Sequence, residues 1–144
     1  MKALTDTSVL VAGILKLHPD HQRAVAILQQ IEQGQLSAVV SAHSLAETYS
    51  TLTRMPLPLR VLPLPAWRAV EANLALGFTV FALTAADYRD LLEHLAQNNI
   101  AGGVTYDGVI AWVAYKAQVD QIITFNAKDF RRVVPALAAQ VVIP

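Results

Sequence analysis

The sequence contains no cysteine, so it offers neither a disulfide framework nor a thiolate metal site. Any bound metal must therefore have oxygen or imidazole ligands, which favours Mg²⁺ or Mn²⁺ over a structural zinc. Imidazole is itself a poor candidate, because the four histidines share no spacing that suits a metal site or a general base. They are His18, His21, His43 and His94.

Long apolar runs are also missing. No stretch approaches the roughly 18 uncharged apolar residues that a membrane span requires. At the N-terminus, Asp6 interrupts the apolar residues too early for a signal peptide. We therefore expect a soluble, cytoplasmic protein with no membrane contact.

The sequence also lacks a net charge, because 11 basic residues balance 11 acidic ones. This balance argues against a broad basic surface for non-specific nucleic-acid binding. The charge balance does not exclude a nuclease, because a bound metal would supply positive charge at the scissile phosphate.

What the chain does have is length and apolar content. Its 144 residues fit a single domain over residues 1–144. The hydrophobic share is 54%, above the usual value for a globular domain. We expect part of this excess to lie in a buried interface with a second chain, such as that of a homodimer. The alternative explanation is simply a composition rich in alanine and leucine.

Short apolar runs alternate with segments of helical periodicity. Strands are predicted near Leu4, where the run ends near Asp6 or continues just past it, and at residues 36–40, 79–83, 121–125 and 141–143. Helices are predicted from Pro19–Asp20 to Gly34, and at residues 44–53, 66–76, 84–98 and 106–117. This alternation indicates an α/β domain with a mainly parallel sheet of about five strands, covered by helices on both faces.

Several acids lie beside the predicted strands, and each has an ordinary local explanation. Asp6 fits an Asx turn or a helix cap. Glu47 fits a capping box with Ser44 as the N-cap. Asp107 fits the first turn of a helix behind Thr105, where the helix dipole favours an acid.

Their joint placement is less easily explained by local structure. Ligands of open parallel sheets bind beyond the carboxyl ends of the strands, and Asp6, Glu47 and Asp107 can all lie at that edge. Asn126 and Asp129 follow the fourth predicted strand, although turn chemistry accounts for them equally well. Clustered carboxylates repel one another unless a cation neutralises them, and hard oxygen ligands suit Mg²⁺ or Mn²⁺.

Four segments in this order resemble PIN domains, and in size and pattern the chain is most similar to the VapC-type toxins of toxin–antitoxin pairs. The segments are Leu4–Ala12, Ser44–Glu47, Gly102–Asp107 and Ile123–Phe130. Each motif is weak alone, whereas four in order over nearly the whole chain form a fairly specific signal. The resemblance implies a PIN-like three-layer α/β/α sandwich.

The resemblance also implies a function. The expected protein is a Mg²⁺- or Mn²⁺-dependent endoribonuclease, the toxin of a type II pair, with RNA as substrate and a cognate antitoxin as partner. By position, Asp6 and Asp107 would be the main metal ligands and Glu47 a direct or water-mediated one, and all three would be catalytic. Asn126 occupies the position where the family often has a fourth acid, with Asp129 three residues on. Asn126 can coordinate through its carbonyl oxygen but adds no charge.

Other residues are candidates for contacts with partners. Arg54, Lys128 and Arg131 could meet RNA phosphates, although solvated surface charge explains each of them equally well. The apolar, proline-rich stretch Met55–Trp67 could receive an antitoxin segment or a second subunit, or could pack on its own domain.

The alternative function is a PIN-like module that binds RNA or protein without catalysis. Two other phosphate-handling folds are disfavoured by single residues. A haloacid-dehalogenase-type phosphatase needs an acid where this chain has Ser8, and a receiver domain needs one where it has Leu83–Thr84.

Overall fold

The computed structural model describes all residues from 1 to 144. The strands are β1 (Lys2–Thr5), β2 (Ser37–Ser41), β3 (Thr79–Phe81), β4 (Gln121–Ile123) and β5 (Val141–Val142). The helices are α1 (Thr7–Ile14), α2 (His21–Glu32), α3 (Ala42–Arg54), α4 (Pro63–Leu74), α5 (Ala85–Gln97), α6 (Val104–Lys116) and α7 (Ala127–Val133). A 3₁₀ helix, η1, spans Pro135–Gln140.

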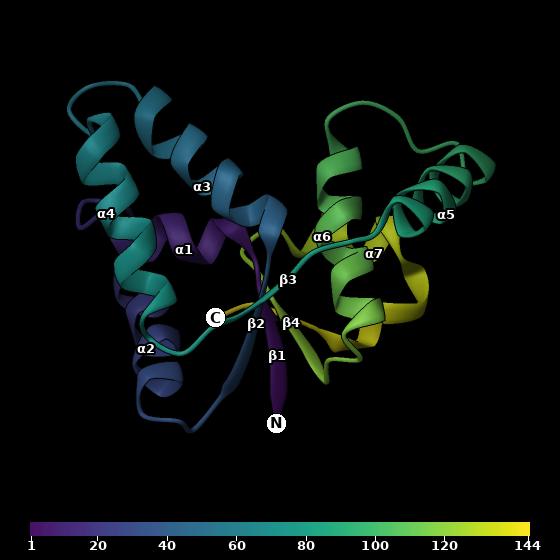
Figure 1. The fold of residues 1–144 in the computed structure, drawn as a ribbon, viewed down its shortest axis with the longest axis horizontal. Helices are drawn as coiled ribbons and strands as arrows, with labels where there is room; N and C mark the ends of the chain where they lie inside the picture. The colour runs from purple at the N-terminus through teal and green to yellow at the C-terminus, as the bar shows by residue number, and fades with distance from the viewer.

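The strands form one parallel sheet in the order β3-β2-β1-β4-β5 (Figure 1). Leu4 of β1 pairs with Val39 of β2 on one side and with Ile122 of β4 on the other. The chain moves outward from β1 through β2 to β3, then returns across the sheet to β4. The strand order therefore reverses between β1 and β4, which is where open parallel sheets bind their ligands.

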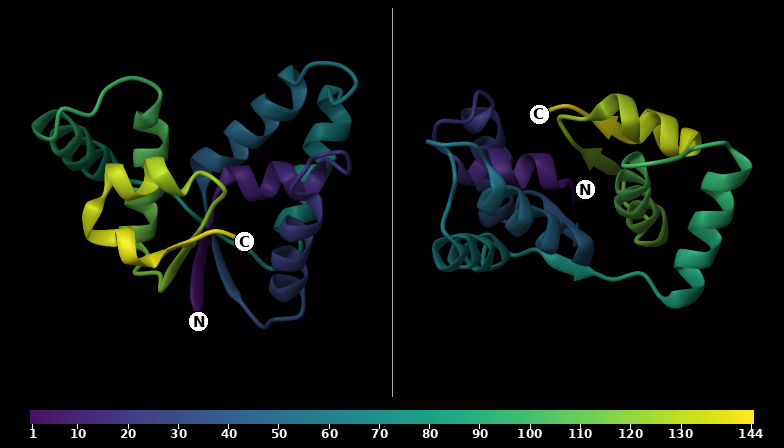
Figure 2. Two further views of the ribbon diagram at one scale, coloured as in Figure 1. Left: turned by 180° about the vertical axis from the view of Figure 1, so that it is seen from behind. Right: turned by 90° about the horizontal axis from the view of Figure 1, so that it is seen from above.

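Helices cover both faces of the sheet, as the sequence predicted. Figure 2 shows α1 to α4 on one side of the strands and α5 to α7 on the other. Side chains alternate along each strand between the two layers. Ala3 packs with the core beneath α1 and α2, whereas the next residue, Leu4, packs with the core beneath α5, α6 and α7. The protein is thus a three-layer α/β/α sandwich.

The first strand ends at Thr5, which agrees with the predicted end near Asp6. Val9 to Val11 lie in helix α1, which was not predicted. Asp6 starts that helix as its N-cap, with its carboxylate accepting from the backbone N–H of Ser8. Most of α1 is buried, so its sequence shows no polar face that would reveal a helical period.

Two of the predicted helix caps are wrong. Ser41, not Ser44, caps α3, so Glu47 belongs to the second turn and forms no capping box. Gly103, not Thr105, precedes α6. In both cases the helix begins earlier than predicted, and the expected cap residue lies inside it. Asp129 and its neighbours, interpreted as a turn, form helix α7.

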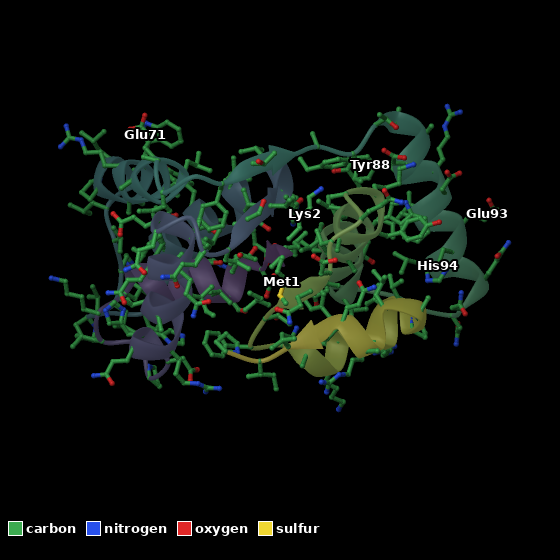
Figure 3. All side chains as sticks on the ribbon, turned by 90° about the horizontal axis from the view of Figure 1, so that it is seen from below. Met1, Lys2, Glu71, Tyr88, Glu93 and His94 are labelled. Carbon is green, nitrogen blue, oxygen red and sulfur yellow. The ribbon has the colours of Figure 1, made fainter.

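The amino ends of the strands lie at the edge opposite the acids. Met1 and Lys2 mark this edge in Figure 3. The Nζ of Lys2 donates to the carbonyl of Ala117, and its backbone N–H donates to Asp120. None of the helices combines the length and the apolar character needed to cross a membrane.

Candidate metal centre

Asp6 is the most deeply placed acid of the site. It follows β1 directly and is 3% exposed. Its Oδ2 accepts from the hydroxyl of Ser8 at 2.7 Å and from that of Thr124 at 2.8 Å. Burial raises the pKa of Asp6, while these hydrogen bonds act in the opposite direction. The carboxylate is therefore fixed in position and lacks full solvation.

Thr124 and Ser8 tie β1 and β4 together behind this carboxylate. The Thr124 hydroxyl accepts from the backbone N–H of Asn126 at 2.9 Å, and the Ser8 hydroxyl accepts from that of Phe125 at 3.1 Å. The backbone N–H of Asp6 in turn donates to the carbonyl of Ile123. The loop after β4 is thereby held against the start of α1.

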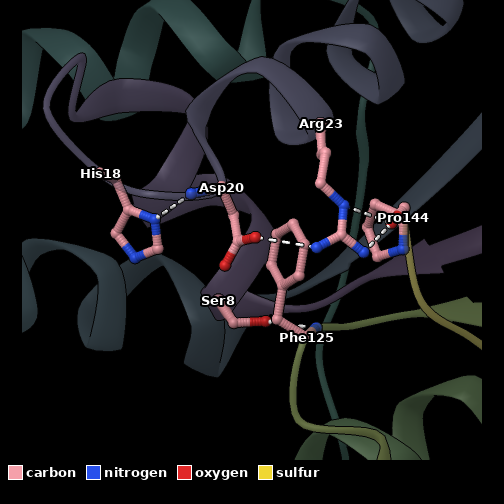
Figure 4. A network of polar contacts seen from close by, with 6 residues as sticks. All are labelled: Ser8, His18, Asp20, Arg23, Phe125 and Pro144. Carbon is pink, nitrogen blue, oxygen red and sulfur yellow. Dashed lines mark hydrogen bonds and ion pairs between the residues drawn. The ribbon is translucent and has the colours of Figure 1, made fainter.

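A second set of contacts holds this loop from the side of α2 (Figure 4). The guanidinium of Arg23 lies 5.1 Å from the centre of the Phe125 ring. The same group donates to Asp20 at 2.9 Å and to the carbonyl of Pro144. Phe125 is thus held at the rim of the site by both its backbone and its ring.

Asp107 approaches from the opposite layer, in the first turn of α6. Its Oδ2 accepts from the side-chain amide of Asn126 at 3.3 Å, and the same amide donates to Asp129 at 3.0 Å. Asn126 therefore bridges the two carboxylates that lie beyond the end of β4.

The electrostatics of Asp107 show that the acids are brought together. Its pKa is raised to about 7, first by burial and then by the negative charges of Asp6, Asp129 and Glu47. Side chains from the start of α1 and from α3, α6 and α7 thus share one electrostatic environment. Asp6, Glu47 and Asp107, which the sequence singled out as metal ligands, line one cavity, and their role as ligands stays a prediction.

Glu47 lies one turn after His43 on α3. Its Oε2 is 3.0 Å from the Nε2 of His43. The two atoms are not aligned as a hydrogen bond, and each is buried without another hydrogen-bond partner. Glu47 therefore keeps acceptor capacity for a ligand.

A cavity of about 270 Å³ lies between these side chains. Asp6, Glu47, Asp107 and Asn126 line it, together with smaller polar residues. Asp129 does not line it and reaches the site only through Asn126. Of the two candidates for the fourth position, Asn126 is therefore the one that faces the cavity.

The donor set suits a hard divalent cation. None of the carboxylates Asp6, Glu47, Asp107 and Asp129 forms an ion pair with lysine or arginine. The one basic side chain beside them is His43, next to Glu47, so a cation would supply the charge that offsets the remaining repulsion. No three acidic or histidine side chains lie close enough together, as they stand, to coordinate one ion.

The predicted phosphate-binding residues differ in their surroundings. Arg131 donates to the carbonyl of Val141 at 3.3 Å, which commits part of its guanidinium to the chain itself. Lys128 is exposed at the start of α7, outside the lining of the cavity. Arg54 lines a neighbouring groove on α3.

Some residues of the site were not singled out from the sequence. Ser8 and Thr124 orient Asp6, and His18 lines the cavity from the loop before α2. Two sequence signals could have indicated these roles: Ser8 lies two residues after Asp6, and Thr124 lies near the end of the strand predicted at residues 121–125. Their roles depend on pairing between β1 and β4, which the sequence alone does not specify.

Comparison with known proteins identifies the family. A family model described as the PIN domain matches residues 3–134. The chain belongs to the PIN domain family. Ribonuclease VapC40 of Mycobacterium tuberculosis is 40% identical over 130 residues, which cover 89% of this PIN domain chain and 87% of that protein. Ribonuclease VapC27 of the same species is 36% identical over 109 residues, covering 76% of this chain and 74% of that protein.

Solved structures support the PIN fold at lower sequence identity. The crystal structure of Mycobacterium tuberculosis VapC20, a sarcin-ricin loop cleaving toxin, superposes with a TM-score of 0.66 at 19% identity and covers 88% of this chain and 92% of that one. VapBC2 from Rickettsia felis, bound to a promoter DNA fragment, gives a TM-score of 0.68 at 20% identity, covering 100% of this chain and 98% of that one. At this identity the likeness concerns the fold alone.

Proposed function

We propose that this PIN domain is a metal-dependent endoribonuclease and the toxin of a toxin–antitoxin pair. The observation that carries the catalytic proposal is that acids from opposite layers line one cavity and none of them is paired with lysine or arginine. Relatives named as VapC ribonucleases support RNA as the substrate. Solved structures of VapBC and FitAB assemblies with the same fold support an antitoxin as the partner. We further propose that a second copy of the chain forms a homodimer with it.

Mg²⁺ or Mn²⁺ would supply positive charge at the scissile phosphate and lower the pKa of a coordinated water. Asp6 and Asp107 would hold the ion, with Glu47 as a direct or water-mediated ligand and Asn126 contributing its carbonyl oxygen. Ser8 and Thr124 keep the Asp6 carboxylate in one orientation. Glu47 would accept a proton from the attacking water, and the Nε2 of His43, 3.0 Å from Glu47 Oε2, would lie beside that proton.

The direct test incubates the purified protein with total RNA in the presence of Mg²⁺, Mn²⁺ or EDTA. We expect cleavage with either metal and none with EDTA. Asp90→Asn is a matched control, since Asp90 is an exposed acid on α5 outside the carboxylate cavity, and it should cleave like the wild type. RNA that is bound but left intact with both metals would instead favour the non-catalytic binding module.

Replacing Asn126 with aspartate should strengthen metal binding. The change adds a negative charge beside Asp107 and removes the amide that bridges Asp107 and Asp129. We expect an apparent Mn²⁺ affinity on the order of 10-fold tighter, because site charge sets the affinity of hard cations. The metal-free variant should melt at a lower temperature because carboxylate repulsion increases. Titration calorimetry with Mn²⁺ measures the first effect, and unchanged affinity would exclude Asn126 as a ligand.

A further inference from the structure

A second groove adjoins the carboxylate cavity, between α3 and the first turn of α6. Its volume is about 370 Å³. Glu47 lines both spaces, so the groove opens directly beside the proposed metal position. The lining residues are His43, Ala46, Glu47, Ser50, Arg54 and Tyr106.

The α3 side of this groove is a single stripe of the helix. Positions 43, 47, 50 and 54 recur at helical spacing and therefore share one face. From His43 to Arg54 the stripe is about 16 Å long. It starts with an imidazole and a carboxylate at the metal position and ends with a guanidinium. The groove therefore leads away from the negative site toward a positive group.

Tyr106 forms the opposite wall near the metal position. It precedes Asp107 on α6, so the two side chains leave the helix in different directions, toward the groove and toward the carboxylate cavity respectively. Its ring stacks on that of His43, with centroids 5.3 Å apart and planes inclined by 4°. Tyr106 nevertheless remains 57% exposed. An aromatic ring supported on one side and open to solvent suits the stacking of a planar ligand.

Arg54 marks the far end of the groove as a site for an anion. It is exposed, and it forms no ion pair and no side-chain hydrogen bond within the chain. The carboxylates around Asp107 repel phosphates, whereas a guanidinium attracts them and can bind two of their oxygens. A ligand with a flat ring and a phosphate some distance from it therefore fits the groove.

Resting on the proposed ribonuclease function, we propose that this groove binds a nucleotide of single-stranded RNA next to the scissile phosphate. The base stacks on Tyr106, and a phosphate further along the strand binds Arg54. The strand is unpaired there, because only an unstacked base exposes a face to a protein ring. A protein partner fits less well, since a docking helix buries an apolar face, and four of the six lining residues are polar or charged.

Binding of a fluorescent single-stranded oligoadenylate tests the groove independently of cleavage. In the Asp6→Asn background the RNA stays intact, and fluorescence anisotropy reports its affinity. Tyr106→Ala should weaken binding about 10-fold, because stacking of one base contributes about 1–3 kcal/mol. Tyr106→Phe keeps the ring and should bind like the parent. Tyr115→Ala is the matched control, as Tyr115 is 55% exposed on the same helix outside the groove.

Arg54→Gln tests the other end of the groove. It should weaken binding and reduce the slope of log affinity against log salt by about one, as expected for the loss of one phosphate contact. Arg68→Gln, at an exposed position on α4, should leave the slope unchanged. With Asp6 intact, the affinity for Mn²⁺ should be the same in Tyr106→Ala as in the wild type, which separates this groove from the metal position.

The outcomes distinguish this proposal from the ribonuclease proposal. Equal RNA affinity in Tyr106→Ala and the parent, or no binding of single-stranded RNA by the parent, would overturn the groove proposal. A protein that binds RNA through Tyr106 but cleaves none with either metal would leave the groove proposal supported and overturn the ribonuclease proposal. In a cleaving protein, Tyr106→Ala should raise KM more than it lowers kcat.

Discussion

Replacing Asp107 with asparagine should make the metal-free protein more stable and, at the same time, inactive. The folded-state pKa of Asp107 is about 7, above an unfolded value of about 3.9. Folding therefore favours its protonated form. That contribution to stability is fully present below about pH 4 and is lost as the pH rises through about 7. Above pH 7 the ionised group destabilises the fold.

The size of this effect follows from the shift. About three pKa units correspond to about 4 kcal/mol, and solvent screening of this half-buried group reduces the figure to about 1–2 kcal/mol. Denaturant unfolding in EDTA at pH 8 and at pH 5 measures the difference. The variant should be more stable than the wild type at pH 8, and this advantage should shrink to about a third at pH 5. The asparagine can still accept from Asn126 through its carbonyl oxygen, so no hydrogen bond need be lost.

The same variant should lose its response to metal. Saturating Mn²⁺ should raise the melting temperature of the wild type at pH 8, because a ligand that binds only the folded state stabilises it. We expect little rise in Asp107→Asn, and RNA cleavage reduced by about 10³-fold or more, since a metal supplies several kcal/mol of transition-state stabilisation. A variant that is destabilised at pH 8, or that still cleaves RNA, would contradict this account of the site.

Asp6→Asn should also abolish metal-dependent cleavage, by a similar factor of about 10³ or more. Asparagine caps helices as well as aspartate does, and its carbonyl oxygen can accept from Ser8 and Thr124. The fold should therefore be retained, while the charge that would bind the metal is lost. Cleavage assays and circular dichroism measure the two effects separately.

Asp6→Ala distinguishes the charge of this position from its structural role. Alanine leaves α1 without a cap and leaves the hydroxyl of Thr124 without its acceptor. Loss of a cap costs about 1 kcal/mol, so Asp6→Ala should unfold more easily than Asp6→Asn although both are inactive. Substantial cleavage by folded Asp6→Asn would show that this carboxylate is not a metal ligand.

Much of the fold could be predicted from local patterns. The five strands, their parallel arrangement and helices on both faces follow from short apolar runs alternating with helical periodicity. The helix predicted at residues 84–98 is α5, and Thr84 caps it in a capping box with Asp87. Helix α1 was missed because most of it is buried, which removes the polar face that marks a helix. The predicted N-caps at Ser44 and Thr105 were wrong, because a nearby residue in each case can also precede the first turn of the helix.

The sequence alone determined which residues could bind a hard cation: acids beside strands, an asparagine where a fourth acid was expected, and no cysteine. Only the tertiary structure decided that Asp107 and Asp6 share one environment, because they lie about a hundred residues apart and belong to opposite layers. It also decided that Asn126 faces the cavity and that Tyr106 stacks on His43. These contacts depend on how strands β1, β2 and β4 are ordered in the sheet, which no local pattern encodes.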